Sequence, residues 1–238
     1  DVALPRAASL ELRAEGLWAD YTVETALDHV TVGLEAFAVA LDDPADAYGP
    51  AHGERVPFGL DLEWETEGGT YAYPGVDRYE VPCRVHGEIL VGTEVIHVDG
   101  CGQRDHSWGV RDWWTYGWSW TSGHLDDGTA FHGTHVVLDG HQLYGTGYVQ
   151  AAGSPLVPTD HVARSEVLGR EGLPDHATWR IADLDLRLEP VAFAPVLLTA
   201  GDGRVSRFPR AWCRYVAADG RVGHGWTEWN QPGPPQPA

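Results

Sequence analysis

The sequence predicts an all-β chain built from antiparallel strands. Segments of alternating polar and apolar residues are frequent, whereas patterns with helical periodicity are scarce. The 29 glycines and 16 prolines are spread along the 238 residues, as expected for many short strands joined by turns. Asp-Gly pairs recur between alternating segments of the second half, which is a strong hairpin signal. Together these features favour an antiparallel meander, whose closure into a barrel would remove exposed edges.

The first half offers four strand candidates in order along the chain. Residues 17–30 alternate loosely, and residues 31–41 continue in strand style with a glycine inside. Residues 79–91 place polar residues between Val81, Cys83 and Val85, and residues 93–99 follow after Gly92. Strands are therefore expected over most of this half.

The second half is punctuated by four Asp-Gly turns, which predict four hairpins at Asp127-Gly128, Asp139-Gly140, Asp202-Gly203 and Asp219-Gly220. Residues 151–176 contain Pro155, Pro158 and Pro174 and are expected to be loop-like. Weak helical patterns occur around residues 164–169 and near the N-terminus. A soft boundary lies near residues 98–104, and the Pro/Gly/Gln-rich residues 232–238 are expected to be disordered.

The charge balance restricts the classes of partner. Sixteen arginines, no lysine and 35 acidic residues give a formal net charge of −19, which disfavours nucleic acid and anionic membrane surfaces. No apolar run is long enough for a membrane span, and no signal peptide is visible. Cys83, Cys101 and Cys213 are too few and too scattered for a disulfide scaffold or a zinc site. A cytoplasmic protein with free thiols is the expectation.

Five of the eleven tryptophans fall between Trp108 and Trp120. If residues 112–120 form one strand, one face carries an acid followed by four large aromatics, namely Asp112, Trp114, Tyr116, Trp118 and Trp120. This stripe is expected to form the inner wall of a sheet or barrel. On pattern alone, such a stripe is more often plain core packing than a ligand-binding wall.

Ionisable residues flank the aromatic run. Arg104, Asp105 and His106 precede it, and Arg111 and Asp112 lie inside it. One interpretation is a structural ion-pair network, because buried charges require partners. The other is an acid–base site, because a carboxylic acid in an aromatic cavity has its pKa raised by desolvation and can donate a proton near neutral pH. Aromatic faces could then stabilise a developing cation.

Three other patterns carry little weight. Asp105-His106-Ser107 has the residue types of a catalytic triad, but neighbours in a strand point alternately. His132 and His135 would lie on opposite faces of a strand, which disfavours a metal site. The aspartate-rich stretch at residues 42–46 contains Pro44 and is expected to form a turn. No motif implies a cofactor or a metal.

The string GQRDHSWG at residues 102–109, followed by Arg111-Asp112-Trp113, resembles a known family. It is similar to the AttH-like and hydroxyneurosporene synthase (carotenoid 1,2-hydratase)-like group of the lipocalin (calycin) superfamily. The resemblance extends upstream through residues 78–87 and downstream to residues 208–211 and 223–229. It implies two packed lipocalin-like antiparallel barrels with apolar ligands near their interiors or interface. We expect an N-terminal barrel half over residues 1–99, which is incomplete or reduced, a C-terminal barrel over residues 100–231, and a tail over residues 232–238.

Relatives of this group include hydratases of isoprenoid double bonds, and similar double barrels serve cyclases of polyenes. The first hypothesis is therefore an enzyme that hydrates, isomerises or cyclises an apolar, unsaturated, isoprenoid or polyketide-like substrate. The proton donor would be Asp105, Asp112 or Glu228, and His106 would orient the acid or activate water. Substrate-binding candidates are Arg104, Trp108, Arg111, Trp114, Tyr116, Trp118 and Trp120. The alternatives are a non-catalytic carrier of a hydrophobic ligand and a structural domain of a larger protein.

Overall fold

The computed structural model describes residues 8–50 and 52–233, and these residues group into two compact units. The first unit holds residues 8–42, 52–70 and 80–104, and the second holds residues 43–50, 71–79 and 105–233. Two of the unit boundaries fall inside long strands, namely β6 (Arg78–Val91) and β7 (Glu94–Ser107). The predicted all-β class is confirmed, because the only helices in the described chain are two short 3-10 turns.

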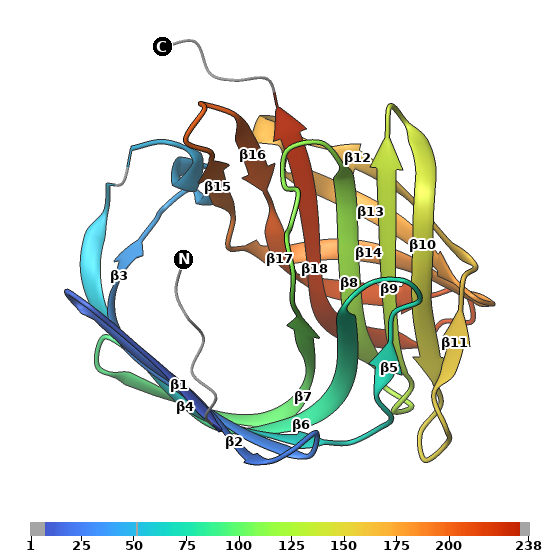
Figure 1. Ribbon diagram of the computed structural model, residues 1–238, viewed down its shortest axis with the longest axis horizontal. Helices are drawn as coiled ribbons and strands as arrows, with labels where there is room; N and C mark the ends of the chain where they lie inside the picture. Colours follow the sequence, from blue (N-terminus) through green and yellow to red (C-terminus); the bar gives the residue numbers. More distant parts are fainter. Residues whose placement is uncertain (1–7, 51, 234–238) are drawn as a thin grey trace. The chain divides into compact units, whose positions relative to one another are not determined.

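The first unit is an antiparallel sheet (Figure 1). Its strands are β1 (Ser9–Ala14), β2 (Leu17–Thr25), β3 (His29–Ala40), β4 (Glu54–Thr66) and most of β6 and β7. Strands β1 to β4 pair in chain order, β6 pairs with β4, and β7 pairs with β6. Within the described chain no pair joins β1 to β7, so this sheet is open. The expectation of a reduced first barrel agrees with this arrangement.

The second unit is built on an 11-stranded antiparallel sheet. Its strands are β8 (Gly117–Leu125), β9 (Ala130–Leu138), β10 (His141–Gln150), β11 (Val157–Thr159), β12 (Val162–Leu168), β13 (Pro174–Ile181), β14 (Leu184–Phe193), β15 (Val196–Thr199), β16 (Val205–Phe208), β17 (Arg210–Ala217) and β18 (Val222–Gly233). The short β5 (Tyr71–Ala72) also belongs to this unit, although it pairs with β6 and not with a strand of this sheet.

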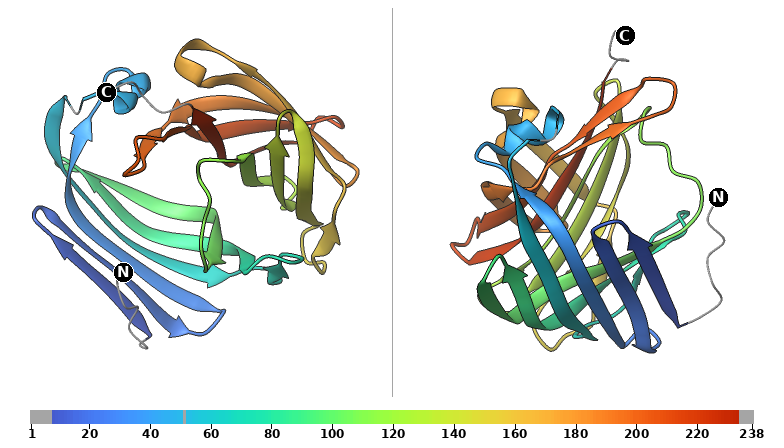
Figure 2. Two further views of the ribbon diagram at one scale, coloured as in Figure 1. Left: turned by 45° about the horizontal axis from the view of Figure 1, so that its top comes forward. Right: turned by 90° about the vertical axis from the view of Figure 1, so that its left-hand side faces the viewer.

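This sheet curls into a nearly closed barrel, which Figure 2 shows from two sides. The order runs from β11 and β10 through β9, β8, β18, β17, β14 and β13 to β12. At the seam the Gln142 side-chain amide on β10 donates to the Val162 carbonyl on β12 over 3.1 Å. The barrel interior is packed with large side chains rather than hollow. Its buried cluster includes Phe131, Trp179, Ile181, Leu188, Tyr215 and Trp229.

The four Asp-Gly hairpins are confirmed, since they join β8 to β9, β9 to β10, β15 to β16 and β17 to β18. Of the predicted strands, residues 17–30 and 31–41 contain β2 and β3, residues 79–91 belong to β6, and residues 94–99 of the fourth candidate belong to β7. The turn expected at residues 42–46 is also present. There the Asp43 side chain accepts a hydrogen bond from the Ala45 amide and begins the 3-10 turn η1 (Pro44–Tyr48).

Two local expectations were wrong. Residues 164–169 are not helical, because most of them belong to β12, which pairs with β13 from Val162 to Leu168. Residues 151–176 are accordingly only partly loop: they contain β11, β12, the start of β13 and the 3-10 turn η2 (Arg170–Gly172). In the expected tail, residues 232 and 233 end β18, and residues 234–238 lie outside the described chain.

Two further expectations concern thiols and membranes. Cys83 and Cys213 are buried, Cys101 is exposed, and all three are free, as the sequence predicts. Neither of the short helical turns in the described residues has the length or the apolar character needed to cross a bilayer.

Candidate functional site

The face of β8 that carries the large rings points away from the barrel interior. Strand pairing places Thr121 beside Gly133 and Thr227, on the face that packs against Tyr215 of the buried core. Trp118 and Trp120 alternate with Thr121 and therefore lie on the outer face. The expectation that the aromatic stripe lines the barrel interior was wrong, because the lumen is already filled by the cluster around Trp179 and Trp229.

The outer face forms one wall of a cavity of about 510 Å³ whose lining residues all belong to the second unit. Strands β8, β9, β10 and β18 contribute side chains, and the segments 73–78 and 105–116 contribute the rest. The lining includes Tyr73, Arg78, Asp105, Arg111, Asp112, Trp113, Tyr116, Trp118, Trp120, Thr134, Tyr144 and Glu228. The site thus combines several aromatic rings with three carboxyl groups and two guanidinium groups.

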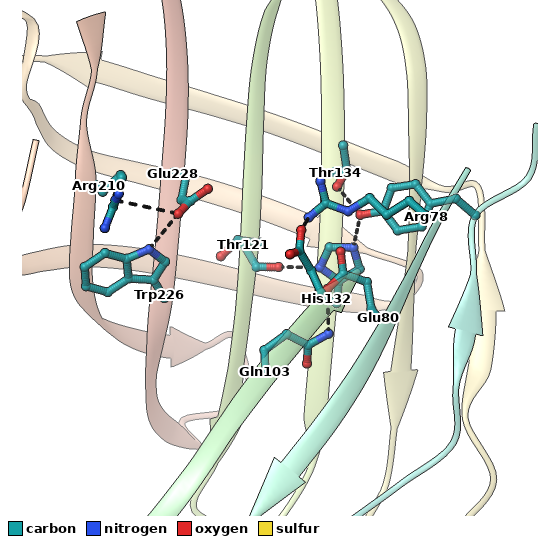
Figure 3. A network of polar contacts seen from close by, with 11 residues as sticks. Arg78, Glu80, Gln103, Thr121, His132, Thr134, Arg210, Trp226 and Glu228 are labelled. Atoms are coloured by element: carbon teal, nitrogen blue, oxygen red, sulfur yellow. Dashed lines mark hydrogen bonds and ion pairs between the residues drawn. The ribbon is translucent and has the colours of Figure 1, made fainter. Parts of the chain in front are cut away.

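Glu228 lies on β18 directly opposite Trp120 on β8. Its Oε1 accepts a hydrogen bond from the Trp226 indole over 3.0 Å, and the Arg210 Nε lies 3.8 Å from the same oxygen (Figure 3). Burial raises the pKa of Glu228 above its usual value, although the Trp226 hydrogen bond and Arg210 act in the opposite direction. Nearby Asp105 adds to the increase. Glu228 therefore has the environment of a carboxyl group that can hold a proton.

Asp105 forms an ion pair with Arg78, whose guanidinium group lies 5.3 Å from the centre of the Tyr73 ring and 6.0 Å from that of Trp120. This pairing requires an ionised carboxylate, so Asp105 is suited to fix Arg78 in the cavity wall. The arginine in turn covers aromatic surface with its charged group.

Asp112 is exposed and organises the loop before β8. Its Oδ1 accepts hydrogen bonds from the amides of Trp114 and Thr115, over 2.9 and 3.0 Å. A hydrogen bond from the Thr115 side chain, followed by these two amides, lowers the pKa of Asp112, so this group favours the ionised form. The side chain makes an Asx-type turn, and the conditional prediction of one strand over residues 112–120 was wrong, because β8 begins only at Gly117.

A buried hydrogen-bond chain on β9 links His132 to two cavity-lining residues, Tyr73 and Thr134 (Figure 3). His132 Nδ1 lies 2.9 Å from the Thr121 carbonyl oxygen, and its Nε2 lies 2.6 Å from the Tyr73 hydroxyl. The same hydroxyl lies 2.7 Å from Thr134 Oγ1. Burial, together with a smaller effect of the nearby Arg78, lowers the pKa of His132 to about 3, so this imidazole is neutral.

The remaining predicted site residues do not line the cavity. The His106 ring stacks on Tyr79, with centroids 5.1 Å apart, and Trp108 packs against both rings and is 51% exposed. Trp114 lies under the guanidinium group of Arg204, 5.7 Å from its centre. Arg104 belongs to the first unit, where its side chain is buried.

Sequence reasoning missed Tyr73, Arg78, Thr134 and Tyr144 as lining residues and His132 as their support. Arg78 was within the resembling segment at residues 78–87 but carried no assigned role. His132 and His135 do face opposite sides of β9: His132 contacts Tyr73, whereas His135 contacts Gln142 at the barrel seam. No spacing rule brings residue 73 to residue 132, because the two lie in segments far apart in the chain.

Comparison with known proteins identifies the family of this chain and the structures that share its fold. A family model described as "Domain of unknown function (DUF7064)" matches residues 1–233. Among solved structures, an AttH-like protein from Nitrosomonas europaea matches with a TM-score of 0.55 and 14% identity, over 90% of this chain and 85% of that one. Kievitone hydratase from Nectria haematococca matches with a TM-score of 0.50 and 10% identity, over 90% and 83%. No curated protein sequence matches the chain. The AttH-like, lipocalin-type fold is thereby confirmed.

Proposed function

Because the chain belongs to the DUF7064 family, a domain of unknown function, we propose its activity from the cavity itself: acid-assisted hydration of a double bond in an apolar, unsaturated small molecule. The observation that carries this proposal is the Glu228 carboxyl group, whose pKa is raised by burial in an aromatic-walled cavity. The hydratase with a similar fold supports the same reaction class. Isomerisation or cyclisation would begin with the same proton transfer.

In the proposed reaction the π electrons of the double bond take the Glu228 proton, which forms a carbon–hydrogen bond and leaves a carbocation. The negative faces of aromatic rings such as Trp118 and Trp120 favour this positive charge. Water then forms the carbon–oxygen bond, and the proton that it loses returns to the Glu228 carboxylate. The sum is alkene plus water giving alcohol, with the enzyme regenerated. A positioned acid of this kind contributes roughly 100- to 10,000-fold to a rate.

The test is turnover in deuterium oxide with kievitone and with the simple isoprenoid geraniol, followed by mass spectrometry. We expect a product that has gained one water and one carbon-bound deuterium. Glu228→Gln keeps an oxygen for the Trp226 hydrogen bond but has no acidic proton, and it should lower turnover at least about 100-fold. Asp112→Asn is the matched control, because an amide oxygen can still accept the Trp114 and Thr115 amides, and it should stay active. Undiminished turnover in Glu228→Gln would exclude this acid.

A second candidate is a non-catalytic carrier of a hydrophobic ligand. It is favoured by the structural tasks of the other two carboxylates, since Asp105 pairs with Arg78 and Asp112 holds a loop. Native mass spectrometry of the purified protein separates the two: a bound apolar molecule that is never converted would support the carrier. Failure to bind any apolar molecule would instead favour a structural domain.

A further inference from the structure

The outer face of the barrel carries a straight row of side chains across three neighbouring strands. Glu228 on β18 pairs with Trp120 on β8, and Trp120 pairs with Thr134 on β9. Adjacent strands are about 4.8 Å apart, so Glu228 and Thr134 stand about 10 Å apart at the backbone with the indole between them. All three residues line the cavity. A ligand lying along this row would have the acid at one end and Thr134 at the other.

The hydrogen-bond chain behind Thr134 fixes the direction of its hydroxyl. A carbonyl oxygen can only accept, so the His132 nitrogen facing Thr121, Nδ1, carries the ring proton. The neutral ring then offers Nε2 as an acceptor, and the Tyr73 hydroxyl must donate to it. Since a phenol has one proton, the contact between Tyr73 and Thr134 is made by the Thr134 proton.

Thr134 therefore turns only lone pairs toward the cavity. A ligand group that meets this wall must be a hydrogen-bond donor, because another acceptor would find no proton there. This hydrogen-bond chain is not suited to activate water as a base, because a histidine with a pKa of about 3 does not take up a proton near neutral pH. Recognition of a donor group fits this arrangement better than catalysis.

Building on the proposed function, we propose that the substrate class is an unsaturated apolar molecule that carries a hydroxyl group. The hydroxyl donates its proton to Thr134 Oγ1, and the reacting double bond lies near Glu228 on the far side of Trp120. In this assignment Thr134 determines specificity, and Tyr73 and His132 are positioning residues that keep its proton out of the cavity.

The test compares two probes by calorimetry, naphthol and its methyl ether, which differ in whether the oxygen can donate. The wild-type chain should bind naphthol more tightly, by roughly three- to tenfold for one neutral hydrogen bond. Thr134→Val keeps the shape of the side chain but removes the oxygen, and it should abolish the preference. Thr134→Ser is the conservative control and should retain it.

Each outcome decides between the proposals. Equal binding of the two probes by the wild-type chain, or an unchanged preference in Thr134→Val, would overturn the hydroxyl assignment and leave the proposed acid untouched. If Thr134→Val does not fold, the wild-type comparison still decides. Failure of both probes to bind would overturn the cavity as a ligand site, and the proposed function with it. If the protein prefers naphthol but converts no substrate, only the proposed enzymatic activity is overturned.

Discussion

At the scale of single residues, the second unit surrounds its cavity-lining carboxyl groups in three different ways. Glu228 is half-buried between an indole and a more distant arginine, which raises its pKa. Asp105 is paired with Arg78, and Asp112 accepts two backbone amides. Environments that push the pKa values of neighbouring acids apart commonly divide their roles. Here the division leaves Glu228 as the group best able to carry a proton.

His132 should make the folded chain sensitive to mild acid. Its pKa is about 3 in the folded chain and near 6.5 when exposed, so between these values the unfolded chain binds a proton that the folded chain does not. The stabilisation present above pH 6.5 is therefore lost as the pH falls toward 3. One proton corresponds to about 1.4 kcal/mol per pH unit in the free energy of unfolding. Urea unfolding between pH 7 and pH 5 measures this slope, because ordinary carboxyl groups titrate below this pH interval, at roughly pH 4.

The matched variant is His132→Gln, which removes the titrating ring and should reduce the slope by about one proton. His135, whose pKa burial also lowers, contributes in the same range and remains in both proteins. Identical slopes in the two proteins would show that His132 takes up a proton in the folded chain, and the fixed direction of the Thr134 hydroxyl would no longer follow.

The site residues that the sequence could identify lie in or beside the aromatic run, together with Glu228 in the C-terminal segment of the resemblance. Asp105, Asp112, Trp118 and Trp120 were noticed because acids and rings are adjacent in the chain. Tyr73, His132 and Thr134 were missed because their contact depends on how segment 71–79 lies against β9. The environment of Glu228 is set by Trp226, two residues earlier on β18, and by Arg210 on the paired strand β17, and this pairing is not readable from a single segment.

At the scale of elements, the Asp-Gly turns were predictable because their chemistry is local. Each turn glycine adopts a positive φ, which side chains with a Cβ rarely adopt. Two of the wrong expectations arose where local signals were weak or were overruled by other contacts. Residues 164–169 have helical spacing, yet pairing with β13 makes them strand. Residues 112–116 alternate like a strand, but the Asp112 side chain bonds to the backbone and holds a turn.

The hairpin between β15 and β16 offers a test within one turn. Gly203 has a φ of +84°, so Gly203→Ala should destabilise the chain by about 1 kcal/mol. Gly201 lies in the same turn with no positive φ and has open space where a Cβ would sit, so Gly201→Ala should be neutral or slightly stabilising. Thermal unfolding of the two variants gives the comparison. An equal loss of thermal stability in the two variants would mean that the turn tolerates no side chain at either position.

At the scale of the whole second unit, alternation identifies which residues share a face but not which face is inside. The sequence correctly separates Trp118 and Trp120 from Ser119 and Thr121. Large rings suggest an interior, yet the lumen is filled from other strands. A Cβ on Gly133 of β9 would meet Ile181 at 3.0 Å and Trp179 at 3.4 Å, so this inner face is small to make room for them. On β8 the inner-face residues Ser119 and Thr121 are small as well, and the large rings Trp118 and Trp120 lie on the outer face.

Because the lumen and the cavity lie on opposite faces of one sheet, stability and ligand binding should respond to different tryptophans. Trp179 is 1% exposed in the core, and Trp179→Ala should lower the free energy of unfolding by about 3–5 kcal/mol while the folded protein still binds naphthol. Trp118, half-buried against Trp113 and Phe208 at the cavity, should behave in the opposite way. Trp118→Ala should cost less stability and weaken naphthol binding several-fold, since it removes part of the aromatic wall. Calorimetric titration and urea unfolding of both variants measure the two effects. If Trp179→Ala abolished binding under conditions where it stays folded, the ligand would have to reach the barrel interior, and the outer-face cavity would not be the site.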